Sequence, residues 1–251
     1  IARRMFDSKT ATISALLLPG CYLHFQIARW AITDMALNFF ILLAFYFFIR
    51  GFQDESNQRT NYYLAYLSMG IGFMVKGPPA VLIPAIVIGG FIFILRDWKK
   101  LRQLRIGQGA AILIAIIFPW FAIMLFLHGD DFKNHILGAE LQDRIIHKTP
   151  FSFYYVGVII RYYLPWSLFF LVALAVKLNI ASIFSLEKSY NKNYFSTFLD
   201  KLRFQCRELI TKDNLYFQFC LLWGMGPLLL FTLLRIEHSR YMLPSSPAIA
   251  M

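Results

Sequence analysis

The chain has 251 residues, of which 58% are hydrophobic and 18% aromatic, and this composition excludes an ordinary soluble domain and favours a membrane protein. The net charge of +11 does not indicate nucleic-acid binding, because the Lys and Arg residues lie in short links between apolar runs. The three cysteines, Cys21, Cys206 and Cys220, have no CxxC spacing, so they predict neither a disulfide framework nor a metal knot.

Long uncharged runs recur along the chain, and each can cross about 30 Å of hydrocarbon as a helix. The predicted spans are residues 10–28, 30–49, 60–75, 78–95, 106–127, 151–176 and 214–234, with an eighth beginning at Tyr241. Pro19 and Gly20 interrupt the first run. The predicted fold class is therefore all-α: a polytopic transmembrane helical bundle that forms a single domain over residues 1–251. Because the chain begins at Ile1 and ends within a helical pattern, we expect an internal fragment.

Most Lys and Arg residues lie in alternate links between the predicted spans. These links contain Arg3, Arg4 and Lys9, then Arg50 and Arg59, then the basic residues of 96–105, and finally those of a long loop over 177–213. The positive-inside rule places these links in the cytoplasm. The opposite face then carries residues 29–34, Lys76, the link 128–150 and the link 235–240. Ionisable groups near membrane depth are costly and usually handle substrates or ions, so we expect a site on that face.

Asp34 and Lys76 each have a simpler structural interpretation beside the functional one. Asp34 follows Thr33 at a predicted helix start, where a carboxylate commonly caps a helix; it can also act as a base or orient a cation. Lys76 precedes Gly77 and two prolines, so its ammonium either extends to the membrane interface or binds a phosphate at a helix end.

The outer link over residues 128–150 is rich in ionisable groups. Phe132, Ile136, Leu137 and Leu141 recur at helical spacing, which predicts an amphipathic helix at the membrane interface. Its polar face would carry His135, Glu140, Arg144 and His147, either as a solvated surface or as part of a site. There is no HxxxH or HExxH spacing, so a divalent metal stays possible without support from the ligand pattern.

The order of several short motifs resembles that of a known family. The motifs are residues 29–34 before an aromatic-rich span, 72–78 (GFMVKGP), 118–120 (FPW), 140–144 (ELQDR), 147–150 (HKTP) with 154–155 (YY), 164–166 (LPW), and 240–244 (RYMLP) with 247–248 (PA). They occur as in bacterial relatives of the dolichyl-phosphate-mannose protein mannosyltransferases, with particular similarity to the aminoarabinose transferases of lipid A. The resemblance covers nearly the whole chain, and its specificity lies in the order of the motifs.

The resemblance implies an inverting glycosyltransferase of the C superfamily at the periplasmic face of a bacterial inner membrane. Its donor would be a polyprenyl-phosphate sugar and its acceptor lipid A, a glycan or a protein, with membrane lipids as further partners. By matching position, Asp34 is the candidate catalytic carboxylate, and the substrate-binding candidates are Arg29, Lys76, Glu140, Arg144, His147 and Arg240. Among these, Lys76 and Arg144 would contact phosphate, Arg240 would be another basic contact, and Glu140 and His147 would line the outer loop.

Two features depart from the family pattern. The family's leading catalytic aspartate lies in a loop that corresponds to sequence upstream of Ile1. Aminoarabinose transferases tend to have Glu-His in the outer loop where this chain has Glu140-Leu141, which argues against a metal there.

The alternative function is a polytopic transporter or lipid flippase, although such proteins often contain repeated halves and none is evident here. A non-catalytic scaffold would leave the one-sided charge unexplained.

Overall fold

The computed structural model describes residues 1–30, 32–133, 154–164, 166–177 and 214–251. All regular secondary structure in these residues is helical. The helices are α1 (Ala2–Met5), α2 (Ser8–Gly20), α3 (Tyr22–Arg29), α4 (Thr33–Gln53), α5 (Gln58–Lys76), α6 (Pro79–Leu95), α7 (Trp98–Gln103), α8 (Ile106–Lys133), α10 (Tyr154–Tyr162), α11 (Trp166–Lys177), α14 (Leu215–Leu234), the 3-10 helix η4 (Ser239–Ser245) and α15 (Ser246–Ala250). The predicted all-α class is confirmed.

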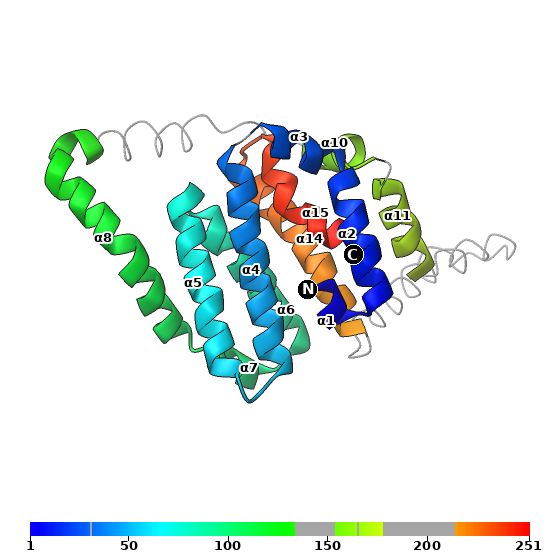
Figure 1. Cartoon of the computed structure of the whole chain (residues 1–251), viewed down its shortest axis with the longest axis horizontal. Helices are drawn as coiled ribbons and strands as arrows, with labels where there is room; N and C mark the ends of the chain where they lie inside the picture. Colours follow the sequence, from blue (N-terminus) through cyan, green and yellow to red (C-terminus); the bar gives the residue numbers. More distant parts are fainter. Residues whose placement is uncertain (31, 134–153, 165, 178–213) are drawn as a thin grey trace, which may run out of the picture.

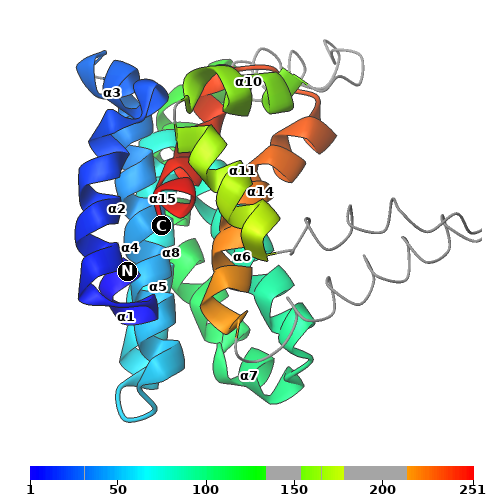
Figure 2. The same ribbon diagram turned by 90° about the vertical axis from the view of Figure 1, so that its right-hand side faces the viewer.

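The helices form a bundle with two distinct ends. Helices α2, α4, α5, α6 and α14 run side by side, with α3 and α10 at one end and α7 at the other (Figures 1 and 2). Helix α4, the stretch Trp98–Phe132 and α14 are long and apolar enough to cross a membrane, and α2 with α3 would make a fourth span. The α7 end carries Arg50 in the last turn of α4 and Arg59 in the first turn of α5. Helix α4 begins and α5 ends at the opposite, α10 end, as the charge pattern predicted.

Three predicted spans differ from the observed helices. The run 10–28 is two helices, α2 and α3, bent by 60° at Cys21, because Pro19 and Gly20 weaken the end of α2. The run 151–176 is divided into α10 and α11. At Tyr241 the chain is in the 3-10 helix η4, and α15 starts only at Ser246.

The outer link 128–150 begins as a continuation of α8. This helix extends to Lys133 and changes direction at Gly129, whose φ is 48°. The rest of that link, where we predicted an interfacial helix, and the predicted cytoplasmic loop beyond Lys177 lie outside the described residues.

An aromatic cluster at the centre of the bundle joins α4, α6 and α14. Phe45, Phe48, Phe91, Phe219 and Trp223 are almost fully buried. The rings of Phe48 and Phe219 stack with centroids 5.8 Å apart, and those of Phe45 and Trp223 lie 4.6 Å apart. Such aromatic pairs add about 0.5–1.5 kcal/mol each beyond the area they bury. The cluster therefore holds the helices whose ends build the site described next.

Candidate functional site

Asp34 lies in the first turn of α4 at the α10 end of the bundle. The helix begins at Thr33 after Ile32, and no side-chain hydrogen bond caps it. The capping interpretation of Asp34 is therefore wrong, although a negative charge in a first helical turn remains favourable. Only 3% of the Asp34 side chain is exposed, and its carboxylate forms an ion pair with the Lys76 ammonium.

Lys76 is the last residue of α5, and the turn that follows it positions its ammonium. Gly77 has φ 82° and ψ −151°, and the chain then enters α6 through Pro78 and Pro79. This turn places Lys76 beside the start of α4. The Lys76 side chain is 20% exposed and contacts Asp34 rather than extending freely to the membrane interface. Because the carboxylate is almost fully buried, each charge depends on the other for compensation.

Gly77 adopts a backbone conformation that is essentially restricted to glycine, so Gly77→Ala is expected to destabilise the fold by about 1–3 kcal/mol. An added Cβ would meet nothing within 4 Å, so the cost comes from the backbone and not from a clash. The measurement is the thermal unfolding temperature of the purified protein in detergent. Gly107→Ala is the matched control, because its Cβ also meets nothing and its φ is ordinary. Equal unfolding temperatures for the two variants would contradict a requirement for this turn.

Two cationic side chains converge on the ring of Tyr241. The Lys76 Nζ atom lies 6.0 Å and the Arg240 Cζ atom 5.9 Å from the ring centroid, which is within the range of cation–π attraction. Phe231 of α14 stacks on the same ring at 4.6 Å and fixes its orientation. Asp34, Arg240, Tyr241 and Phe231 also line one narrow crevice. Arg240, which the sequence assigned to this face, is thus in the same site as Asp34 and Lys76.

The Arg240 guanidinium has an unused donor. Its Nε atom is buried and has no hydrogen-bond partner within the part of the chain that the structure describes. Buried polar atoms in proteins are nearly always paired. A guanidinium presents a planar set of donors that suits phosphate and carboxylate oxygens. The crevice is therefore chemically suited to an anionic oxygen of a ligand.

The link between α14 and η4 is held in place by Tyr155 of α10. The Tyr155 hydroxyl donates to the carbonyl of Ile236 and accepts from the backbone N–H of His238 at 3.3 Å. On the other side of the link, the Trp223 indole donates to the carbonyl of Pro244 at 2.7 Å. These bonds tie the segment that carries Arg240 to both α10 and the aromatic core.

The pKa of His238 is affected by the charged groups of the site. Burial, followed by the positive charges of Arg240 and Lys76, lowers the pKa of His238 from its ordinary value of 6.5, and Asp34 opposes this effect. The imidazole is therefore neutral at pH 7. Arg240 and Lys76 each affect this pKa more than Asp34 does, so positive charge outweighs negative charge beside His238 and would favour a bound anion.

The structure extends the candidate set beyond the residues predicted to form the site. Tyr155, His238 and Tyr241 were not among them. Two of these residues lie in the motifs 154–155 and 240–244, but nothing in the sequence indicates that Tyr155 reaches the link before η4. That contact joins segments 81 residues apart.

Among the remaining predicted site residues the structure describes only Arg29, and it does not bring this residue into the cluster. Arg29, at the end of α3, is exposed and lies over the Phe25 ring at 5.5 Å, and it forms no ion pair with Asp34 among the described residues. Glu140, Arg144 and His147 lie outside the described residues, so their roles stay predictions. Within the described ranges no group of three or more His, Cys, Asp or Glu residues is placed to hold a metal ion.

Comparison with known proteins identifies relatives along the chain. Residues 1–123 match the family model described as dolichyl-phosphate-mannose-protein mannosyltransferase. The whole chain is 26% identical to an uncharacterised protein of Aquifex aeolicus (strain VF5) and covers 44% of it. Over 98% of its length it is 26% identical to the undecaprenyl phosphate-alpha-4-amino-4-deoxy-L-arabinose arabinosyl transferase of Serratia proteamaculans (strain 568), of which it covers 40%. The chain therefore spans less than half the length of these relatives.

Two solved structures share the fold. They are crystal structures of ArnT from Cupriavidus metallidurans, one in the apo state and one bound to undecaprenyl phosphate. The TM-scores are 0.69 and 0.71 at 20% identity, with 99% of this chain matched to 40% and 41% of the crystallised chains. The predicted resemblance to bacterial relatives of the dolichyl-phosphate-mannose protein mannosyltransferases is confirmed, and so is the polytopic helical membrane fold.

Proposed function

We propose that this chain is part of a membrane glycosyltransferase that moves a sugar from a polyprenyl-phosphate donor to an acceptor, with inversion at the anomeric carbon. The observation that carries the proposal is the site at the α10 end, where the Asp34–Lys76 ion pair lies beside Tyr241 and Arg240, whose buried Nε atom has no partner among the described residues. The relative from Serratia proteamaculans supports it, because its name describes a transferase of an undecaprenyl-phosphate sugar. The single transmembrane domain over residues 1–251 is part of the same proposal.

In this reaction an acceptor oxygen forms a bond to the anomeric carbon as the bond from that carbon to the phosphate oxygen breaks. The leaving phosphate takes the electron pair, and its growing negative charge needs fixed cations. Lys76 and Arg240 occupy positions suited to that task, with Lys76 held in place by Asp34. Asp34 would also position the acceptor and take the proton of an acceptor hydroxyl.

The outer-loop residues complete the proposed site. Arg144 would be a further phosphate contact, Glu140 and His147 would form the loop wall, and Arg29 would contact the substrate at the exposed end of α3. The acceptor is lipid A, a glycan or a protein. The positive-inside pattern favours a periplasmic location for the α10 end in a bacterial inner membrane.

Transfer and transport are distinguished by one assay. The full-length protein in proteoliposomes is supplied with a synthetic polyprenyl-phosphate sugar and, in separate reactions, lipid A, an oligosaccharide or an acceptor peptide. We expect mass spectrometry to detect a glycosylated product with one of these acceptors and release of polyprenyl phosphate in equal amount. Movement of the intact donor across the membrane without product in any reaction would favour the flippase alternative and contradict the proposal.

The acceptor is tested independently in cells. Mass spectrometry of lipid A from a deletion strain should show the loss of a sugar substituent if lipid A is the acceptor. Unchanged lipid A would exclude it as the acceptor, and the glycans and proteins of the deletion strain would then be compared with those of the parent strain.

A further inference from the structure

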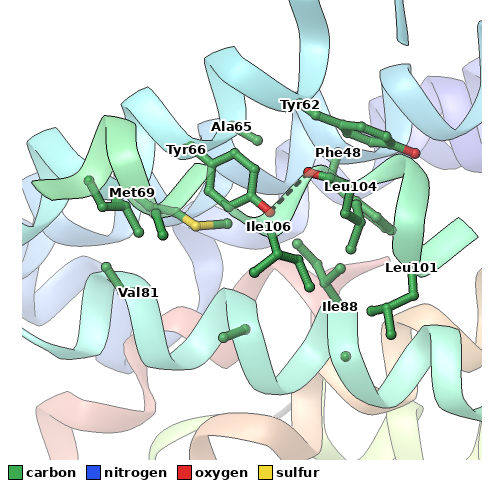
Figure 3. Close-up of a pocket in the computed structure, with 14 residues that line it drawn as sticks. Phe48, Tyr62, Ala65, Tyr66, Met69, Val81, Ile88, Leu101, Leu104 and Ile106 are labelled. Carbon is green, nitrogen blue, oxygen red and sulfur yellow. Dashed lines mark hydrogen bonds between the residues drawn. The ribbon is translucent and has the colours of Figure 1, made fainter. Parts of the chain in front are cut away.

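A second cavity extends from the α7 end of the bundle along α5 and α6 as far as Val81, in the first turn of α6, and it shares no lining residue with the crevice at Asp34. It has a volume of about 250 Å³ and is enclosed by residues of α4, α5, α6, α7 and α8. Figure 3 shows Tyr62 and Tyr66 on one side of it, Ile88 on another, and Leu101 and Leu104 near α7. None of these residues contributes to the Asp34–Lys76 site.

The cavity is suited to hydrocarbon and not to water. Its lining consists of apolar and aromatic side chains and Gly89. The hydroxyl of Tyr66 is already used, because it donates to the carbonyl of Leu104 at 3.2 Å (Figure 3). A buried water needs two to four polar partners, which this lining does not supply. The neighbouring α8, which lines the cavity with Ile106, Ala110 and Leu113, has no buried residue in its most apolar window, so it presents a long apolar surface beside the cavity.

Helix α7 covers the cavity with one apolar and one basic face. Leu101 of α7 and Leu104, which follows it, line the cavity, whereas Lys99 and Arg102 are exposed. Trp98 is 59% exposed, as expected for an indole at a membrane interface. The flanking residues add to the basic surface. The basic residues of this segment are Arg96, Lys99, Lys100, Arg102 and Arg105, and its single acidic residue, Asp97, accepts the backbone N–H of Lys99 at 3.1 Å.

We propose that this cavity binds an acyl chain of an anionic phospholipid whose headgroup lies on the basic residues of α7. Apolar lining and positive charge adjoin at one short helix, and clusters of Lys and Arg beside membrane helices attract anionic headgroups. Charge complementarity therefore selects the headgroup, and the cavity accepts the chain. The inference does not rest on the proposed glycosyl transfer.

Native mass spectrometry of the delipidated full-length protein tests the inference. Three lipids are added separately: dioleoyl phosphatidylglycerol, dioleoyl phosphatidylcholine and undecaprenyl phosphate. We expect phosphatidylglycerol to bind at least about tenfold more tightly than phosphatidylcholine, because Lys and Arg residues near the membrane surface attract anionic headgroups.

Gly89→Leu tests the cavity directly. Gly89 lines the cavity and a Cβ there meets nothing within 4 Å, so a leucine side chain would fill space that the acyl chain needs. We expect at least a tenfold loss of phosphatidylglycerol binding. Gly107→Leu is the matched control, because it adds the same side chain at another open glycine that does not line the cavity.

The headgroup is tested by the double variant Lys99→Gln/Arg102→Gln, which changes only exposed side chains and therefore should not impair folding. It should lower the preference for phosphatidylglycerol over phosphatidylcholine at least about threefold, while Arg96, Lys100 and Arg105 retain part of it. An unchanged preference would contradict the assignment of the headgroup to α7. Three outcomes would overturn the inference: equal affinity of the unmodified protein for both phospholipids, unchanged binding in Gly89→Leu, or displacement of phosphatidylglycerol by an equal concentration of undecaprenyl phosphate. Complete absence of bound phospholipid would overturn it as well, and would indicate that protein fills the cavity.

Discussion

Replacing Asp34 by Asn is expected to lower the rate of sugar transfer at least about 100-fold, the lower end of what a positioned acid–base group contributes. Asn keeps the size of the side chain but removes the carboxylate. That carboxylate holds the Lys76 ammonium and would take the proton of the acceptor hydroxyl. The measurement is the initial rate of product formation in proteoliposomes at saturating donor.

Loss of folding is the competing explanation for an inactive Asp34→Asn variant, because it leaves Lys76 without its counter-charge. The double variant Asp34→Asn/Lys76→Gln removes both charges, so it should recover thermal stability without recovering activity. Asp54→Asn is the control for the change itself. Asp54 follows the other end of α4, is partly exposed and bonds Ser56 and Asn57, and its replacement should leave the rate within about twofold. Full activity of Asp34→Asn would refute the site assignment.

Lys76→Ala is expected to lower the transfer rate about 100- to 1,000-fold, as removal of one fixed donor does at sites that stabilise a developing negative charge. The same variant should bind undecaprenyl phosphate at least about tenfold more weakly, because a hydrogen bond to a charged group contributes about 1.5–3 kcal/mol. Isothermal titration of the detergent-solubilised protein with undecaprenyl phosphate measures the second effect. A merely structural role for Lys76 would lower activity through stability and leave the affinity of the folded fraction unchanged.

Two further variants, one at Lys76 and one at another lysine, show whether the effect depends on positive charge at position 76. Lys76→Arg preserves the positive charge and should retain part of the affinity for phosphate. Lys9→Ala removes an exposed lysine of α2 that contacts no part of the site and should change neither rate nor affinity. Undiminished phosphate affinity in Lys76→Ala would exclude Lys76 as a phosphate contact.

Hydropathy alone predicted most of the bundle. The predicted spans 30–49, 60–75 and 78–95 correspond to α4, α5 and α6 within a few residues, because a helix in hydrocarbon must satisfy its own backbone hydrogen bonds over its whole length. The hydropathy pattern did not predict whether a helix bends or continues at a proline. The same residue type stands at the end of α2, where the chain bends by 60°, and inside α14, which continues through Pro227.

The charge pattern also predicted which polar residues share a face. Asp34, Lys76 and Arg240 were assigned to one face from topology alone, and all three lie at the α10 end. Topology could not predict which of these residues contact each other, since two residues on the same face can lie as far apart as the bundle is wide. It also could not identify Asp34 as an ion-pair partner instead of a helix cap, because both roles fit a carboxylate in a first helical turn.

The sequence by itself therefore determined the class of fold, the direction of the helices and the end at which Asp34, Lys76 and Arg240 lie. These features depend on the short-range cost of placing charge and unpaired backbone in hydrocarbon. Only the tertiary structure decided which of those residues touch. The Asp34–Lys76 pair, the two cations on Tyr241 and the anchoring of the link 235–240 by Tyr155 each join residues that are distant in the chain. Their contacts are set by the packing of the aromatic core and by one glycine turn after Lys76. Gly77 and the two prolines predict that a helix ends there, but no local pattern encodes which side chain Lys76 then meets.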